Sequence, residues 1–333
     1  MPIFPKTITK SIWSNHLKTY SHTLIEYIDQ CIPLFSPDTK ILSPYHLYLC
    51  PLCLQNYFAE SKDGIIGNAE FSLDHLPPES VGGEFQIITC KRCNNKAGEY
   101  EAELQKLIDF GSKPDKKYDS IFPKMMVKSK ETGETFHAIV QHTPGTISIG
   151  FNEDAKKHNK DLKEFLVKLH SGQLQSLQLL FPSPDFEKTA KAILKSAYLL
   201  CFAWWGYEFA FSKNAKMIRQ VLSDEIQYPT RIPTIWKRSK DDSVPQGISI
   251  VSKDGNREAF IVTFWLKGNN ENFIASTLIP NPTEKGWEKL FELDKFVKQK
   301  ELTEFQATTL PRTVIRNGYS IAWNIIFPEE QSH

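Results

Sequence analysis

The sequence lacks the features that assign a chain to a specialised class at first sight, beginning with net charge. Its 40 Lys and Arg residues are balanced by 39 Asp and Glu residues in a total of 333. Residues 1–120 hold 12 basic and 15 acidic side chains, so no large part of the chain is strongly basic. A nucleic-acid partner would therefore have to be bound by a local patch, because a basic domain is absent.

The sequence also lacks a long apolar run, an internal repeat and a low-complexity tract. Its longest apolar stretch, Tyr198–Phe211, is interrupted by Gly206 and Glu208 and falls short of the ~20 residues that span a bilayer. We therefore expect a buried helix there, and no membrane association. The first residues, Met1–Lys6, lack the apolar core of a signal peptide, which predicts a cytoplasmic protein.

Cysteine is scarce, with six residues, but four of them are arranged as two C-x-x-C pairs. These pairs are Cys50/Cys53 and Cys90/Cys93, whereas Cys31 and Cys201 lie alone among apolar residues. Two such pairs can supply four thiolates to one tetrahedral zinc ion, which leaves no open position for chemistry. We therefore predict a structural zinc site in a reducing compartment, and we consider a redox role for these pairs less consistent with the sequence.

A second set of polar residues lies between and beside the cysteine pairs. Asp74 and His75 precede two prolines, and Asn94 directly follows Cys93. A carboxylate and an amide oxygen are hard ligands that suit Mg²⁺ or Mn²⁺. Histidine changes its charge near neutral pH, so His75 can accept a proton from water. Adjacent strand residues point to opposite faces, so Asp74 and His75 can share one site only if the strand ends there.

These residues carry a family resemblance. The pattern C-x2-C, D-H-x-x-P, G-G and C-x-x-C-N-x-x-x-G, within residues 45–110, resembles the zinc-bound bacterial subgroup of the HNH endonucleases, which have the ββα-metal fold. The resemblance implies that His75 is the general base and that Asp74 and Asn94 hold a catalytic Mg²⁺ or Mn²⁺. One position departs from the family pattern, because Phe85 stands where the family has its middle asparagine. Glu84 or Gln86 could replace that asparagine.

Three basic residues surround Asn94 in the sequence. Lys91, Arg92 and Lys96 could hold the phosphates of a nucleic acid, and the resemblance implies that this partner is double-stranded DNA. An ordinary solvated basic surface is the alternative interpretation of each residue. In the second half, Lys188, Lys191 and Lys195 share a helical face, which we interpret as a solvated face opposite an apolar one.

The element pattern predicts an α+β protein. We expect an N-terminal helical segment over residues 1–44, a zinc-stapled HNH domain over residues 45–112, and a larger α+β domain over residues 113–333 with a mostly antiparallel sheet. The polar residues 111–120, which include Gly111 and Pro114, predict a linker, and Tyr319–Phe327 predicts a final strand. We also expect a tight turn at Gly82-Gly83 between two strands, a helix over residues 94–110, and a break near Gly206 in the long helix. The last domain matches no function, and target recognition, dimerisation with a second copy or another protein partner, or regulation are its candidate roles.

The sequence therefore predicts a metal-dependent endonuclease that hydrolyses DNA, with restriction or anti-phage defence as an association only. Two alternatives stay open. One is a regulated effector, whose nuclease is switched on by a ligand or partner protein. The other is a catalytically inactive zinc module that binds nucleic acid or a protein.

Overall fold

The protein is described by a computed structural model. The residues that the structure describes are 10–24, 27, 46–61, 64–111, 120–143, 146–151, 160–173, 176–180, 184–227, 234–237, 245–253, 256–268, 271–281, 285–290 and 306–309. The expected linker at 111–120 lies outside these residues except for its first and last positions, and the expected strand at 319–327 lies wholly outside them. Of the N-terminal segment expected over 1–44, residues 1–9, 25, 26 and 28–44 also lie outside.

The chain forms two compact units. Unit 1 comprises residues 1–104, 186–266 and 273–333, and unit 2 comprises residues 105–185 and 267–272. Unit 2 is thus largely an insertion between two segments that pack together in unit 1. The units are defined by packing and not by activity, so the functional boundaries at residues 44 and 112 stay predictions.

The cysteine region of unit 1 consists of short strands followed by a helix, in the order expected. Strands β1 (Leu47–Leu49), β2 (Tyr57–Ser61) and β3 (Gly64–Gly67) form a three-stranded antiparallel sheet. Strands β4 (Phe71–Leu76) and β5 (Phe85–Cys90) form a hairpin through the short helix η4 (Glu79–Val81), and helix α3 (Lys91–Gly111) follows without a break. The second cysteine pair therefore spans the junction between β5 and α3.

The connection between β4 and β5 requires glycine. Gly82 ends η4 with a left-handed backbone (φ 89°), which glycine adopts without steric cost. A Cβ on Gly83 would lie 1.5 Å from the carbonyl oxygen of Pro77, so only glycine fits there. The predicted tight turn at these two glycines is confirmed.

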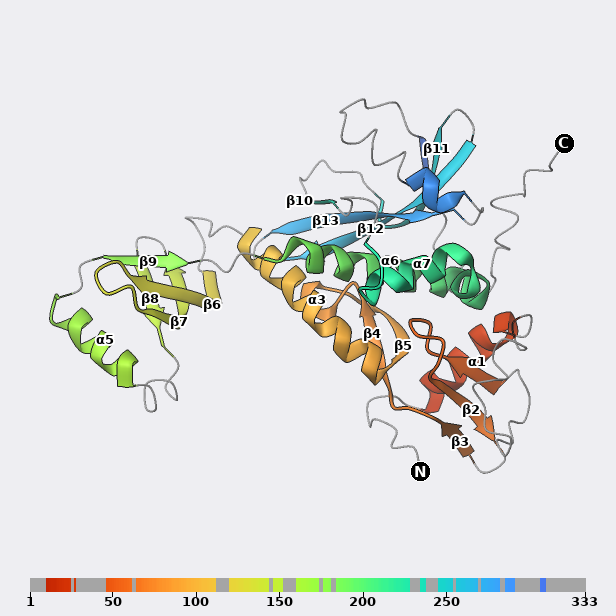
Figure 1. Cartoon of the computed structure of the whole chain (residues 1–333), viewed down its shortest axis with the longest axis horizontal. Helices are drawn as coiled ribbons and strands as arrows, with labels where there is room; N and C mark the ends of the chain where they lie inside the picture. The colour runs from red at the N-terminus through yellow and green to blue at the C-terminus, as the bar shows by residue number, and fades with distance from the viewer. Residues whose placement is uncertain are drawn as a thin grey trace. The chain divides into compact units, whose positions relative to one another are not determined.

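Helix α6 (Phe186–Phe211) is the central element of unit 1, and it is buried along almost its whole length from Ala192 onward. Figure 1 shows it between the β4–β5 hairpin and the large sheet. Trp205 packs on Phe260 of that sheet, with ring centroids 4.8 Å apart. Helix α1 (Lys10–Leu24) packs on α6 through Tyr20 and Phe202, whose rings are stacked at 4.8 Å. Among the described helices, none is long and apolar enough to cross a membrane.

The large sheet of unit 1 has five antiparallel strands in the order β10-β13-β12-β11-β14. Its strands are β10 (Thr234–Lys237), β11 (Gly247–Lys253), β12 (Asn256–Lys267), β13 (Asn272–Pro280) and β14 (Gln306–Thr309). Helix α7 (Lys213–Leu222) follows α6 and packs against it. Mixed helices and antiparallel sheets confirm the predicted α+β class, although β10 and β14 were not expected from the sequence.

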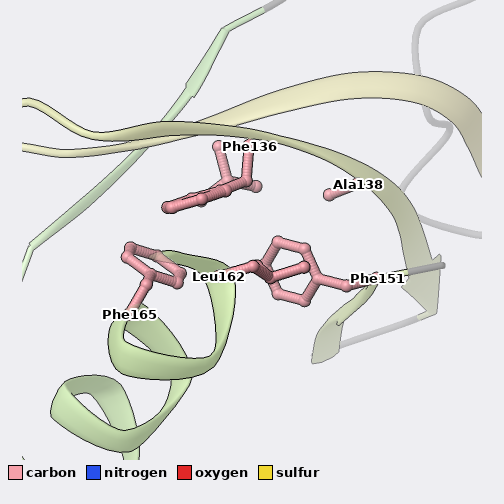
Figure 2. Packing of buried hydrophobic residues seen from close by; sticks show 6 residues of the cluster. Phe136, Ala138, Phe151, Leu162 and Phe165 are labelled. Atoms are coloured by element: carbon pink, nitrogen blue, oxygen red, sulfur yellow. The ribbon is translucent and has the colours of Figure 1, made fainter. Parts of the chain in front are cut away.

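Unit 2 is a second, smaller α+β body with its own core. Its antiparallel sheet has the order β8-β7-β6-β9, with strands β6 (Ser120–Ser129), β7 (Thr135–Thr143), β8 (Thr146–Gly150) and β9 (Leu177–Leu180). Helix α5 (Lys160–His170) covers one face of this sheet. Figure 2 shows the packing, in which Phe165 of α5 lies against Phe136 of β7 with ring centroids 4.7 Å apart.

The kink in α6 requires a glycine at position 206. Gly206 has φ 59° and ψ −139°, and the next amide, of Tyr207, donates a hydrogen bond to Thr23 Oγ1 of α1 at 3.0 Å. A Cβ on Gly206 would lie 2.4 Å from the same Oγ1 atom. The break that the sequence predicted near Gly206 is therefore confirmed, and it is also the place where α1 is attached.

Gly206→Ala should destabilise unit 1 by about 2 kcal/mol or more, because alanine adds a backbone penalty and a clash with Thr23. Gly98→Ala is the matched control. Gly98 lies within α3 with no atom near its added Cβ, so this change should stabilise unit 1 by about 1 kcal/mol. Urea unfolding followed by tryptophan fluorescence reports on unit 1, which contains all 7 tryptophans. Equal midpoints for the two variants would contradict this account of the kink.

Candidate functional site

The four cysteines of the two C-x-x-C pairs come together in unit 1. Their sulfur atoms all lie within 4.8 Å of one another, and Cys53 Sγ is 3.9 Å from Cys90 Sγ. Four sulfurs around one zinc ion, each at about 2.3 Å, are separated by about 3.8 Å. The cluster therefore has the ligand type, number and spacing to hold one metal ion such as zinc. Burial raises the pKa of the Cys50 thiol well above its usual value, which a bound cation would oppose.

The first cysteine pair is positioned by α6. The Tyr207 hydroxyl donates to the carbonyl oxygen of Leu49 at 2.6 Å and accepts from the Leu49 amide at 2.7 Å. The Tyr198 hydroxyl donates to the carbonyl oxygen of Pro51 at 2.7 Å. The backbone on both sides of Cys50 is thus hydrogen-bonded to a helix that lies about 150 residues later in the chain. The position of the four-cysteine cluster therefore depends on α6.

Asp74 is buried at the centre of the site, with 2% of its side chain exposed. Its Oδ1 atom accepts a hydrogen bond from Lys195 Nζ at 2.7 Å, and its Oδ2 atom accepts one from Thr89 Oγ1 at 3.2 Å. Lys195 lies on α6 and is equally buried. The same ammonium group donates to Glu101 Oε1 of α3 at 2.6 Å. One lysine therefore joins β4, α3 and α6 through two carboxylates.

The charges of this cluster depend on one another. Burial alone would lower the pKa of Lys195, but the two carboxylates raise it above its usual value. Burial raises the pKa of Glu101, and the Lys195 ammonium opposes that shift. The Lys195 ammonium thus has a carboxylate on each of two sides, Asp74 at 2.7 Å and Glu101 at 2.6 Å. An unpaired ion at such a position would be strongly destabilising.

Asn94 reaches the strand that carries Asp74. Its amide nitrogen donates to Ser72 Oγ at 2.9 Å and to the carbonyl oxygen of Leu73 at 3.3 Å. Ser72 and Asp74 are two residues apart in β4, so they share a face of the hairpin. The structure thus places Asn94, in the first turn of α3, on the side of β4 that Asp74 faces. No hydrogen bond to its amide oxygen occurs among the described residues.

His75 has a different partner. Its Nε2 atom lies 2.7 Å from the side-chain nitrogen of Gln86, the residue directly opposite in β5. An amide nitrogen can only donate, so in this arrangement Nε2 accepts and the neutral ring carries its proton on Nδ1. Gln86 was one of the two residues named as a substitute for the family's middle asparagine, and it is the one bonded to His75.

The expected end of the strand at His75 is wrong. Strand β4 continues to Leu76, and its pairing with β5 is regular from Phe71 onward. Proline ends a strand because it has no N–H to donate to the neighbouring strand. Both prolines come after Leu76, so Leu76 itself can still pair. Consecutive residues of a regular strand alternate between its faces. Asp74 and His75 therefore enter two different sets of contacts in this structure.

The three basic residues around Asn94 are exposed, and two of them form ion pairs. Lys91 lies 2.9 Å from Glu70, and Lys96 lies 3.7 Å from Asp224. In the described part of the chain, Arg92 bonds only to the neutral side-chain amide of Gln55. Exposed ion pairs contribute little energy, so none of these contacts prevents phosphate binding. The ion pairs of Lys91 and Lys96 do reduce the local positive charge that the sequence suggested.

The sequence analysis did not find the role of Lys195. Its placement on a solvated helix face with Lys188 and Lys191 is wrong for this residue, which is 2% exposed. A signal was present, because Lys195 follows the apolar residues Ile193 and Leu194 and stands shortly before the longest apolar stretch of the chain. A lysine that is buried must be paired. The sequence could not identify the partner, because Asp74 and Lys195 are 121 positions apart.

Comparisons of the chain with protein-family models, with curated proteins and with solved structures gave no match. The site is therefore interpreted from its own residues and from the resemblance carried by the motif alone.

Cys90→Ser should remove the metal and the cooperative unfolding of unit 1, because a structural zinc ion contributes directly to folding free energy. Cys201→Ala is the control, since Cys201 is also buried but lies in α6 outside the four-sulfur cluster. Elemental analysis should find one zinc per chain in the wild type and in Cys201→Ala, and none in Cys90→Ser. A Cys90→Ser protein that is zinc-free and fully folded would contradict the prediction.

Lys195→Met should lower the free energy of unfolding by about 3–5 kcal/mol, because it leaves the buried carboxylate of Asp74 and the partly exposed carboxylate of Glu101 without a cation. Lys188→Met is matched to it, being on the same helix in an exposed pair with Glu99 at 3.7 Å. That change should cost less than about 1 kcal/mol. Chemical unfolding of both variants measures the difference. Similar losses in the two would show that the buried cluster contributes no more than a surface pair.

Proposed function

We propose that this chain is a metal-dependent HNH-type endonuclease that acts on DNA, and that the described arrangement is its inactive state. The observation that carries the proposal is that Asn94 lies on the Asp74 side of β4, beside the four-cysteine cluster. His75 lies on the same strand, β4, and is hydrogen-bonded to Gln86 of β5. These are the residue types and the chain order that the resemblance requires. The zinc cluster fixes the start of α3 and with it Asn94.

The catalytic metal does not fit the described arrangement. Asp74 would be its only carboxylate ligand in the family pattern, and both oxygens of Asp74 are already bonded, one of them to the Lys195 ammonium. A bound Mg²⁺ or Mn²⁺ would supply neutralisation of phosphate charge. For that, Lys195 must first leave Asp74. The arrangement therefore favours the interpretation as a regulated effector.

His75 also requires a change before it can act as a base. In the described geometry Nε2 accepts from the Gln86 amide. A half-turn of that amide would place its oxygen at Nε2, which would then carry the proton and leave Nδ1 free to accept one from water. Gln86 would thus hold the ring in the catalytic tautomer. In the family, the middle asparagine orients the histidine. Here Phe85 stands at that position, and the neighbouring Gln86 would take over the role.

A second candidate function is a non-catalytic zinc module that binds nucleic acid. The buried Asp74–Lys195 pair favours it, because a permanent ion pair would exclude a metal. The two candidates differ in whether removal of the Lys195 charge creates activity. If the ion pair is only structural, removal of the Lys195 charge should destabilise the protein without creating activity.

Plasmid cleavage with Mg²⁺ or Mn²⁺ tests the proposal. Lys195→Gln removes the charge while its amide can still donate to one carboxylate, and it should cleave at least about tenfold faster than the wild type, because Asp74 is then available. His75→Ala in that background should lower the rate at least about 100-fold. Both variants should retain zinc, and EDTA should stop cleavage.

His170→Ala is the control for the histidine change, because His170 is exposed on α5 of unit 2. It should cleave like its parent. Absence of cleavage by folded, zinc-containing wild type and Lys195→Gln would contradict the nuclease and leave the non-catalytic module. Cleavage that His75→Ala does not reduce would contradict the assignment of the base.

A further inference from the structure

A pocket of about 510 Å³ in unit 1 lies against Cys53, Cys93, α3 and α7. It is lined by five cationic side chains and one carboxylate, which are Arg92, Lys96, Lys195, Lys216, Arg219 and Glu225. We name it the basic pocket. Its volume is in the range of sites for small molecules. Its lining is cationic in a chain whose net charge is only +1, so the charge is concentrated here.

Three of these cations are not neutralised by a carboxylate in the described part of the chain. Arg92 bonds to the neutral side chain of Gln55, and Arg219 bonds to the Tyr198 hydroxyl and to a backbone carbonyl. Lys216 is exposed and forms no ion pair among the described residues. Uncompensated arginine and lysine side chains around one cavity favour an anionic ligand, and phosphate suits them best.

The acidic groups nearby do not cancel this charge. Glu225 bonds to the hydroxyl of Ser223 at 2.7 Å. Asp224 is engaged by Lys191 and, at 3.7 Å, by Lys96. After these are counted, the three uncompensated cations exceed the single lining carboxylate. Among the lining side chains of Lys, Arg, Asp and Glu, the cations thus exceed the carboxylate, which suits a phosphate group. Four thiolates around one Zn²⁺ would add a net charge of about −2 beside Cys53 and Cys93, at one end of the lining.

Lys195 connects the basic pocket with Asp74. Its ammonium has three N–H donors, of which two point to Asp74 and Glu101. The side chain also forms part of the pocket wall, although only 2% of it is exposed. An anion in the pocket can therefore compete with the two carboxylates for the same ammonium.

We propose that the basic pocket binds a small phosphate-bearing ligand, of the size and charge of a nucleoside monophosphate, and that its phosphate draws Lys195 away from Asp74. The second part rests on the proposed function, because it frees Asp74 for the catalytic metal. Binding in the pocket does not depend on it. A concave cavity of this volume favours a small ligand over the continuous backbone of DNA.

Calorimetric titration tests binding first, with inorganic phosphate and deoxyadenosine monophosphate as probes. The wild type should bind one molecule of the nucleotide. Lys216→Glu should weaken binding at least about tenfold, because it reverses one charge in the pocket. Lys213→Glu is the matched control on the same exposed side of α7, outside the pocket lining. It should change the affinity less than about twofold.

Manganese binding tests the coupling, measured from the free Mn²⁺ signal in electron paramagnetic resonance. The nucleotide should raise the Mn²⁺ affinity of the wild type at least about fivefold, and Mn²⁺ should raise nucleotide affinity equally. In Lys195→Gln both factors should fall below about twofold, since the competing ammonium is gone. Lys216→Glu, which leaves the Asp74 cluster intact, should need at least about tenfold more nucleotide for the same gain in Mn²⁺ affinity.

Three results would overturn the inference. One is no binding of phosphate or nucleotide by the folded, zinc-containing wild type. Another is saturation of the same residues by a 12-base-pair DNA duplex that neither small probe can compete with, which would make the pocket part of a DNA track. The third is coupling that persists in Lys195→Gln, which would show a direct contact between metal and ligand. None of these readouts requires DNA cleavage, so a failed nuclease assay leaves the pocket result standing.

Discussion

The structure of unit 1 depends on the neutralisation of one buried charge. Lys195 lies in the middle of a helix that is buried on nearly all sides, and its ammonium cannot remain unpaired there. Asp74 and Glu101 supply the opposite charges at 2.7 and 2.6 Å. This requirement fixes α6 against both β4 and α3. The same helix holds the backbone around Cys50 through two tyrosines, so the orientation of the metal cluster follows from it.

The same interaction gives Asp74 two alternative partners. As long as Lys195 is bonded to it, the carboxylate contributes to stability and is closed to a metal. A hard divalent cation could replace the ammonium only by losing some of its own water, which Mg²⁺ does reluctantly. An anion that binds Lys195 from the basic pocket shifts this balance without touching Asp74. On the proposed function, stability and activity would then be opposite uses of one carboxylate, so the residues proposed to bind the catalytic metal are present but closed to it in the described arrangement.

The sequence predicted the local structure well and the central contact not at all. The cysteine pairs, the β4–β5 hairpin, the helix after Cys93 and the break at Gly206 were all readable, because each depends on residues close in the chain. The end of β4 was misplaced, since Pro77 permits the pairing of Leu76 that precedes it. The Lys195–Asp74 pair joins residues 121 positions apart, and periodicity could not distinguish a solvated lysine from a buried, paired one. Strand β14 was missed for a related reason, because its four residues are defined only by pairing with β11.

The most direct test of the account is a crystal structure of the zinc-containing protein grown with Mn²⁺ and a nucleoside monophosphate, with diffraction recorded at the manganese absorption edge. Our account predicts an anomalous manganese peak within ligand distance, about 2.2 Å, of Asp74 and Asn94 oxygens, with Lys195 Nζ moved toward the basic pocket. A structure in which manganese is absent from Asp74 and the Lys195–Asp74 bond is unchanged, at saturating metal and nucleotide, would contradict it.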